Sequence, residues 1–332
     1  MNQMADIAYS HVTDLRPVQI GRTAAGEAVL SNQVAGMATL TVCVPCYHDH
    51  ASPLISHLSN LPETGRVALL LFDDGSDDDA LTRQLARHIM NHPGPARLVT
   101  APKNGGRSQA RNRLVDLAET DWVLLIDADM RPDTDIFFQR YIKAIENADG
   151  PSLIAGGFTL RQVTPTRQTR LHAAQSARSE CLSAEARSED PGRYVFTSNI
   201  LVHKQILADI TFDDGFTGWG WEDVDWGLRV ATRFPVRHIE NTATHLGLDD
   251  TDALLGKFGR SGANFARLAQ RHPEAVRHMR LWKMAHVLQR LPFRKALTRL
   301  SRTVARTGWI PVSLRLLALK LYRAFCYGEH LA

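Results

Sequence analysis

Residues 122–129 read Trp-Val-Leu-Leu-Ile-Asp-Ala-Asp, five apolar residues followed by two carboxylates one residue apart. An uninterrupted apolar run of this length is typical of a strand that is buried on both faces, as strands of parallel sheets are. Asp127 and Asp129 then lie at the carboxyl end of that strand, where open α/β sheets bind their ligands. Two acids so close repel each other, and a divalent metal that also holds a phosphate would supply the missing positive charge. The stretch therefore predicts a metal and phosphate site at a strand end.

The chain before this strand alternates short apolar runs with helical patterns. Strands are expected over residues 40–44, 67–72 and 97–100. A helix is expected after the second and after the third of these strands, with Ser76 or Asp77 capping the first helix and Ser108 the second. This alternation predicts βαβ units, so we assign an α/β fold with a mostly parallel sheet flanked by helices.

The second half of the chain is less regular. We expect a strand over 153–158 that two glycines interrupt, a helix over 171–187, a strand over 194–202, and helices from about residue 252 onward. Residues 1–37 form a weakly patterned N-terminal extension that can add edge structure. The main α/β domain is expected over 38–250, and a basic helical region over 251–332.

Charge is distributed unevenly along the chain. Residues 251–332 hold sixteen Lys and Arg against three Asp and Glu, a net of +13, so residues 1–250 must carry −9 for the total of +4. An acidic first part can bind a metal and take an anionic nucleotide through it. The basic second part indicates an anionic surface or polymer as a neighbour.

Composition excludes several classes of protein. Four cysteines are too few for a disulfide framework in a chain of 332 residues, and we interpret Cys43 as buried and Cys46 as a loop residue. The N-terminus lacks the charged and apolar segments of a signal peptide, and no run of about 18 apolar residues predicts a membrane span. A cytoplasmic protein is the expectation.

Acids also end the second strand, and a basic loop ends the third. Asp73 and Asp74 follow the strand over 67–72, so parallel pairing brings them near Asp127. Residues 103–107 read Lys-Asn-Gly-Gly-Arg, which lacks the Gly-Lys-Ser/Thr of a phosphate-binding P-loop. Because the loop lies between the two acid pairs, we expect Lys103, Gly106 and Arg107 to line a nucleotide pocket.

A segment rich in tryptophan and acids follows at residues 218–226, Gly-Trp-Gly-Trp-Glu-Asp-Val-Asp-Trp. Aromatic rings suit sugar faces, because both are apolar with a polar edge. Acids at a helix N-terminus are favoured by the helix dipole and kept ionised, as a general base requires. We expect Trp219 and Trp221, together with Asn199, on the acceptor side.

A late histidine can complete the metal site. His245 follows a β-rich stretch, and we expect it to join the carboxylates as a metal ligand, with His238 as the next candidate. A histidine without a motif is more often structural, so this assignment depends on the two side chains meeting in the fold.

These motifs resemble those of GT-A glycosyltransferases of family 2 over about residues 38–250. The resemblance rests on Val44-Pro45-Cys46-Tyr47, Asp73-Asp74-Gly75-Ser76, a loop and helix ending in Ala110-Arg111-Asn112, and Asp127-Ala128-Asp129. The stretch Gly218–Asp223 is similar to a motif shared by β-1,4-galactosyltransferases, polypeptide N-acetylgalactosaminyltransferases and bacterial chondroitin-type polymerases. Trp221 departs from the many relatives that carry Gly, which narrows the acceptor side.

The resemblance implies an inverting transferase that uses a UDP-sugar donor with Mn²⁺ or Mg²⁺. It assigns the uridine to Pro45, Tyr47, Asp73 and Asp74, the ribose or metal to Asp127, and the metal to Asp129 and His245. It assigns the general base to Asp223 and orientation of the acceptor to Glu222. The acceptor is expected to be a glycan or a lipid-linked sugar, in the synthesis of cell-surface polysaccharide.

The basic region has two interpretations. Residues 276–328 contain twelve Lys and Arg and no Asp or Glu, and apolar residues recur at helical spacing. This pattern is typical of amphipathic helices on an anionic membrane, here the inner face of the cell membrane. The alternative is a helical subdomain packed on the core with a solvated basic rim. Nucleic acid is not an expected partner, because no recognised motif accompanies the charge.

Two other functions remain open from sequence. A metal-dependent nucleotidyltransferase shares the needs for phosphate and metal, but it does not need the tryptophan-rich acids. A non-catalytic, membrane-associated nucleotide-sugar-binding protein would keep the fold, but it would not need both the metal ligands and Asp223.

Overall fold

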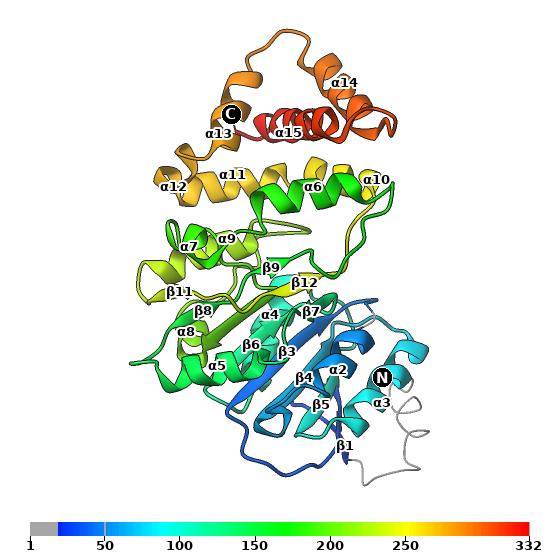
Figure 1. Cartoon of the computed structure of the whole chain (residues 1–332), viewed down its shortest axis with the longest axis vertical. Coiled ribbons are helices and arrows are strands. Elements are labelled where there is room, and N and C mark those ends of the chain that lie inside the picture. The colour runs from blue at the N-terminus through cyan, green and yellow to red at the C-terminus, as the bar shows by residue number, and fades with distance from the viewer. Residues whose placement is uncertain (1–18, 50, 332) are drawn as a thin grey trace.

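A nine-stranded sheet forms the base of the molecule, and helices cover both of its faces (Figure 1). The computed structural model describes residues 19–49 and 51–331. In spatial order the strands are β1 (Gln19–Arg22), β2 (Ala28–Ser31), β5 (Ala96–Thr100), β4 (Val67–Asp73), β3 (Leu40–Cys46), β6 (Trp122–Ile126), β10 (Asn199–His203), β8 (Leu153–Ala155) and β11 (Val236–His238).

The sheet is parallel at its centre and again in the β8–β11 pair at one edge. Strands β5, β4, β3 and β6 run parallel to one another, as the sequence predicts, whereas β2 and β10 flank them in antiparallel pairings. The sheet as a whole is therefore mixed. Strands β1 and β2 extend it at one edge, so residues 19–31 of the expected N-terminal extension belong to the sheet, while residues 1–18 lie outside the described part.

Both faces of the central strands are buried, which explains their continuous apolar sequence. In β6, Leu124 and Ile126 join the core on one side of the sheet, and Val123 and Leu125 join the core on the other. The first core is covered by α2 (Ser52–Leu58), α3 (Asp79–Asn91) and α5 (Phe137–Glu146). The second is covered by α4 (Arg107–Leu117), α8 (Lys204–Asp209) and α9 (Glu222–Ala231).

A second, three-stranded sheet lies beside the end of β6. It consists of β7 (Met130–Pro132), β12 (Ala243–His245) and β9 (Phe158–Thr159), with His245 opposite Met130 in the antiparallel pair. The two glycines do interrupt the strand expected over 153–158, which divides into β8 and β9. Asp133 ties the sheet together, because its carboxylate accepts hydrogen bonds from the hydroxyls of Thr159, Thr242 and Thr244.

Several local expectations are wrong in detail. The helix expected over 171–187 is two helices, α6 (Arg170–Ser179) and α7 (Ala184–Ser188), and residues 194–198 precede β10 without joining it. Asp78, not Ser76 or Asp77, caps α3 by accepting from two backbone N–H groups. Gly106 precedes α4 and Ser108 lies inside it. Cys46 lies in β3 and is buried like Cys43.

The basic region folds into helices that stand above the sheet (Figure 1). They are α10 (Thr251–Arg260), α11 (Gly262–Arg271), α12 (Pro273–Arg277), α13 (Arg280–Leu288), α14 (Arg294–Arg306) and α15 (Val312–Gly328). Helix α15 packs on α6 through Leu316, Leu319 and Tyr322. The region is thus a packed lobe that includes α6, which we call the helical lobe. Within the described residues, no helix is both long and apolar enough to cross a bilayer.

Replacing Asp133 should loosen the small sheet. Asp133→Ala leaves three threonine hydroxyls without their acceptor, and we expect the free energy of unfolding in urea to fall by about 3 kcal/mol. Burial opposes ionisation of Asp133, but the hydrogen bonds outweigh it and lower its pKa. The difference from wild type should therefore be complete above pH ~4 and shrink as the pH falls further.

The exposed Asp135 lies on the same loop and provides the control. Asp135→Ala should change the unfolding free energy by less than about 0.5 kcal/mol. Equal losses in the two variants would contradict the role given to Asp133.

Candidate active site

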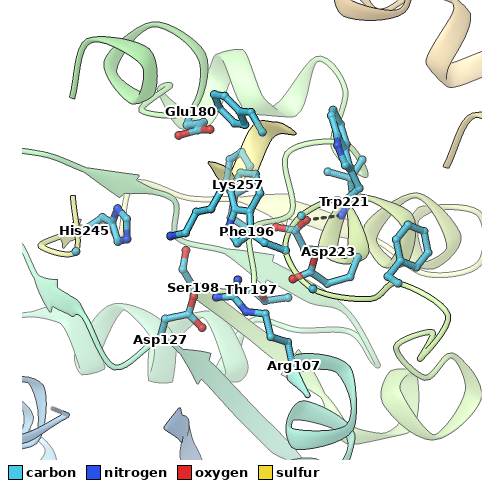
Figure 2. Close-up of a pocket in the computed structure, with 18 of the residues that line it drawn as sticks. Arg107, Asp127, Glu180, Phe196, Thr197, Ser198, Trp221, Asp223, His245 and Lys257 are labelled. Atoms are coloured by element: carbon cyan, nitrogen blue, oxygen red, sulfur yellow. Dashed lines mark hydrogen bonds between the residues drawn. The ribbon is translucent and has the colours of Figure 1, made fainter. Parts of the chain in front are cut away.

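A cavity of about 1400 Å³ lies between the carboxyl ends of the central strands and the helical lobe. Figure 2 shows Asp127 and His245 on one side of it and Asp223 with Trp221 on the other. Most of the expected site residues line this one cavity: Pro45, Tyr47, Asp74, Gly106, Arg107, Asp127, Asp129, Trp219, Trp221, Glu222, Asp223 and His245. Asp73, Lys103 and Asn199 are not among the lining residues.

Strand pairing brings Asp129 and His245 together. Because His245 lies opposite Met130 in the β7–β12 pair, its ring reaches the preceding residue, and its Nε2 is 3.0 Å from Asp129 Oδ2. Burial opposes both charges, but the contact outweighs it, so the pKa of Asp129 is lowered and that of His245 is raised. Gly247 lets the carboxylate lie close, because a Cβ there would collide with Asp129.

His238 does not join this pair. Its Nδ1 is 3.2 Å from Arg187 Nη1, and its Nε2 is 3.0 Å from the carbonyl oxygen of Pro191. His238 is therefore a structural histidine that supports a buried arginine.

Asp127 has a different partner from Asp129. The buried guanidinium of Arg111 donates to Asp127 Oδ1 over 2.9 Å, and its Nη1 is 3.9 Å from Glu222 Oε1. Asp127, expected from the sequence to contact the ribose or the metal, is thus paired with Arg111, whereas Asp129 is paired with His245. Arg111 links the strand-end acid to the acid at the start of α9, so it holds the two sides of the site in register.

The residues present suit a divalent cation of the Mn²⁺ or Mg²⁺ type. Asp129 and His245 present a carboxylate oxygen and an imidazole nitrogen at one point, which are ligands that Mn²⁺ accepts. Among residues 19–49 and 51–331, no group of three or more His, Cys, Asp and Glu has metal-binding geometry. Such ions often take one or two protein ligands and complete their shell with water and substrate phosphates. A two-ligand site is consistent with that pattern.

Asp74 shapes the glycine-rich loop. Its carboxylate accepts from the side chain of Asn104 and from the backbone N–H groups of Gly105 and Gly106, at 2.8–2.9 Å. Asp73 is buried and accepts from the backbone N–H of Ser76 and from its hydroxyl, which corrects its expected place against the uridine. Both acids therefore organise turns, and only Asp74 reaches the cavity wall.

The loop directs one of its cations into the cavity. Figure 2 shows Arg107 between Asp127 and Asp223. Burial opposes its charge, but the carboxylates of Asp127 and Glu222 outweigh burial and raise the pKa of Arg107. Lys103 is exposed and lies outside the cavity, contrary to expectation. A fixed positive charge at Arg107 can balance phosphate oxygens next to the acids.

The start of α9 carries the acids expected for catalysis. Trp221 precedes the helix in the left-handed conformation, with φ of 78°, so that Glu222 and Asp223 occupy the first turn. Burial is the main cause that raises the pKa of Asp223 to about 7, and repulsion from the neighbouring Glu222 carboxylate adds to it. A carboxylate that titrates near neutral pH at a cavity wall is suited to accept a proton from a hydroxyl.

Trp219 and Trp221 line the cavity, but Asn199, which the sequence groups with them, does not. Trp221 donates from Nε1 to the Tyr327 hydroxyl over 3.1 Å, which fixes its ring against the helical lobe. Asn199 is buried between strands, where its side chain accepts from Tyr141 and donates to the carbonyls of Gly157 and Asn241. Its amide is fully used within the protein, so Asn199 is a structural residue and not an acceptor contact.

The sequence did not identify the other half of the cavity. Phe196, Thr197 and Ser198 line it from the loop before β10. Lys257 of α10 reaches in near His245 (Figure 2). Helices α13 and α15 contribute further side chains. The sequence assigns the lysines and arginines of this region to a membrane face or to a solvated rim. Only the packing of α15 on α6 brings some of them to the cavity.

Comparisons with solved structures agree with this fold. The structure is similar to a mannosyltransferase from Pyrobaculum calidifontis in complex with GDP-Man and Mn²⁺, with a TM-score of 0.55 and 13% identity over 98% of this chain and 94% of that one. TarS (residues 1–349) of S. aureus aligns with a TM-score of 0.45 and 13% identity, covering 88% of this chain and 90% of its own.

A third structure, glucosyl-3-phosphoglycerate synthase from Mycobacterium tuberculosis in complex with Mn²⁺, UDP-Glc and phosphoglyceric acid, aligns with a TM-score of 0.49 and 19% identity, covering 70% of this chain and 79% of its own. No curated protein sequence matches the chain.

A family assignment comes from the sequence itself. Residues 41–211, which run from β3 through β10, match the family described as Glycosyl transferase family 2. That segment contains the central parallel strands, Arg107, Arg111 and the strand-end acids, and it spans more than half of the 332 residues. The chain therefore belongs to glycosyl transferase family 2.

Proposed function

We propose that this glycosyltransferase moves a sugar from a UDP-sugar to a hydroxyl of a glycan or lipid-linked acceptor, with inversion and with the help of Mn²⁺ or Mg²⁺. The observation that carries the proposal is that the Asp129–His245 pair and Asp223 line one cavity, with Arg107 nearby. A binding protein would not need a carboxyl group with a pKa near 7 beside the donor site, and a nucleotidyltransferase would not need the tryptophan wall.

Asp223 acts as the general base in this proposal. The acceptor hydroxyl attacks the anomeric carbon from the face opposite the nucleotide, and the Asp223 carboxylate takes its proton. The bond from the anomeric carbon to the UDP oxygen breaks in the same displacement, which inverts the configuration. Glu222 borders the same wall and holds the acceptor, while Arg111 keeps Glu222 in place through its contact at 3.9 Å.

The donor occupies the side of the cavity nearer the sheet. Asp129 and His245 would hold the metal ion, which when bound supplies positive charge to the diphosphate leaving group. Arg107 contributes its own positive charge to the same oxygens, and Tyr47 and Pro45 border the uridine. Because Asp74 already holds the loop over 104–106, its role is to keep the backbone N–H groups and Arg107 in position.

The stretch Gly218–Asp223 supports the acceptor side. Its likeness to the galactosyltransferase and chondroitin-polymerase motif agrees with Trp219 and Trp221 at the cavity wall. An acceptor sugar ring lying on these indoles presents its hydroxyl edge to Asp223. Assembly of a cell-surface polysaccharide would use such a site.

We also propose that the far end of the helical lobe contacts an anionic membrane. Phe293 is 83% exposed and Trp309 82% exposed, at the two ends of α14. Helix α14 carries Arg294, Lys295 and Arg299 exposed between them. Figure 1 shows α14 at the end of the molecule far from the sheet. Apolar tips flanked by cations match the interface of an anionic bilayer, where a lipid-linked acceptor would lie.

Asp223→Asn should abolish most transfer. Loss of the base is expected to lower the turnover number by about 10²–10⁴-fold and leave the affinity for the UDP-sugar nearly unchanged. Release of UDP in the presence of acceptor measures the first quantity and calorimetry the second. Unchanged turnover would refute the assignment.

The pH profile provides an independent check on the same residue. Asp223 works as a base only when ionised, so wild-type turnover should fall as the pH falls through about 7. Exposed Asp214, which also lines the cavity, provides the matched control. Asp214→Asn should keep both the rate and the profile of the wild type.

Asp129→Asn and His245→Ala should weaken metal binding. Removal of either ligand is expected to raise the dissociation constant of Mn²⁺ in the presence of UDP by at least about tenfold, as measured by calorimetry without turnover. Asp214→Asn again makes the same charge change elsewhere in the cavity and should bind Mn²⁺ like the wild type. Wild-type affinity in both ligand variants would place the metal elsewhere.

Membrane contact can be tested with sedimentation of vesicles. The wild type should sediment with vesicles of phosphatidylcholine and phosphatidylglycerol at 70:30 and remain in solution with phosphatidylcholine alone. The double variant Phe293→Ser and Trp309→Ser should bind the mixed vesicles at least about tenfold more weakly, because two apolar side chains no longer enter the bilayer. Met37, 97% exposed on the β2–β3 connection, provides the control Met37→Ser. Equal sedimentation of all three proteins would exclude this surface.

A further inference from the structure

The wall that the helical lobe contributes to the cavity is positively charged. From residue 251 onward, the charged side chains that line the cavity are Lys257, Arg280, Lys320 and Arg323, and no Asp or Glu lines it there. The acids of the cavity all come from the other parts of the chain. Asp249 balances the charge of Lys257, so it is Arg280, Lys320 and Arg323 that make this wall attractive to an anion.

Arg323 is the member of this wall that the fold holds most firmly. Its guanidinium carbon is 4.3 Å from the ring centre of Phe258 and 5.1 Å from those of Trp221 and Tyr327. Three aromatic rings around a guanidinium fix its plane and remove much of its hydration. The cation is thus preorganised by residues of three helices or their termini.

Arg323 has no anionic partner in the protein. Its Nε is buried without a hydrogen-bond acceptor, and within the described chain no carboxylate lies within ion-pair distance of its guanidinium. Two other cations of the lobe do have such partners, since Lys257 contacts Asp249 at 2.7 Å and Arg267 contacts Asp213 at 2.8 Å. Nε is too deeply buried for a ligand to reach, so the terminal Nη groups, which no carboxylate among the described residues contacts, are the atoms that an anion in the cavity would meet.

The position of Arg323 relative to Asp223 indicates which of the two substrates, donor or acceptor, would supply the anion. Trp221 contacts Arg323 through its ring and lies two residues before Asp223, and all three line the same cavity. An anion on Arg323 therefore lies on the side of the cavity that Trp221 borders, next to the segment that carries the proposed general base. Lys320 is one helical turn away on the same face of α15 and adds a second positive charge.

We propose that Arg323, assisted by Lys320, binds an oxyanion of the acceptor, so that the preferred acceptor carries a carboxylate or phosphate near the sugar that is glycosylated. The inference rests on the proposed function, because it places the acceptor on the Asp223 side. A planar guanidinium pairs with two oxygens of either group at once. A uronic acid and a sugar phosphate are the two sources of that chemistry.

The test compares charged and neutral sugars of the same shape. Calorimetry in the presence of UDP and Mn²⁺, which fill the donor side, would measure binding of methyl β-D-glucuronide, glucose 6-phosphate and methyl β-D-glucoside. We expect one or both charged probes to bind at least about tenfold more tightly than the glucoside. The glucuronide arm and the phosphate arm separate the two sources of the anion.

Arg323→Gln should remove this preference, so that charged and neutral probes bind equally weakly. Arg323→Lys keeps the charge but loses the planar fork, and it should retain only part of the preference. Exposed Arg87 of α3 lies outside the cavity, and Arg87→Gln makes the same charge change and should bind all probes like the wild type.

Two results would overturn the proposal: equal binding of the three probes by the wild type, or an undiminished preference in Arg323→Gln. The wild-type comparison needs no variant and stays decisive even if Arg323→Gln lowers the melting temperature. Mn²⁺-dependent release of UDP from UDP-sugars tests the proposed function separately. If UDP is released but charged and neutral sugars bind equally, only the anion subsite at Arg323 is rejected. If charged sugars bind more tightly but no UDP is released from any UDP-sugar, only the assignment as a UDP-sugar transferase is rejected.

Discussion

The contact between Asp129 and His245 joins residues 116 positions apart, and it exists only because β7 and β12 pair in one register. A slip of one residue would turn the imidazole to the opposite face of the small sheet. Asp133 fixes that register through hydroxyls on β9, on β12 and just before it. The proposed metal ligands therefore depend on a carboxylate that does not line the cavity.

The charges of the cavity are arranged in layers. Acids lie at the ends of the central strands and at the start of α9, Arg107 and Arg111 lie between these two groups, and lobe cations form the opposite wall. Asp127 lies beside Arg111 and Asp129 beside His245, and these cationic partners offset part of the cost of burying the acids. In the proposed function, the same arrangement would separate two anions, a nucleotide diphosphate near the strands and an acceptor oxyanion near α15.

The central strands and the cavity could be predicted because they follow from local pattern. The apolar run of β6 predicts a buried strand, and the two acids that follow it must then lie at the carboxyl end of that strand. The match of residues 41–211 to glycosyl transferase family 2 agrees with the α/β fold that this pattern predicts. Asn199 and Asp73 were misplaced because their types suit both a ligand and a buried hydrogen bond, and only the three-dimensional partners decide between them. Arg323 is one of the twelve cations over 276–328 that the sequence assigns to a membrane face or a solvated rim, since helical periodicity shows a face but not what packs against it.

The left-handed backbone at Trp221 has an evolutionary consequence. A φ of 78° strains a bulky residue but suits glycine, so the helix start is already shaped for the smaller side chain. The codons TGG and GGG differ in one base. A single nucleotide change could therefore remove the indole that narrows the cleft, relieve the strained backbone and release Tyr327 from its hydrogen bond. In the proposed acceptor site, such a change would make room for acceptors that the indole excludes, so this position is one where a new specificity could arise in a single step.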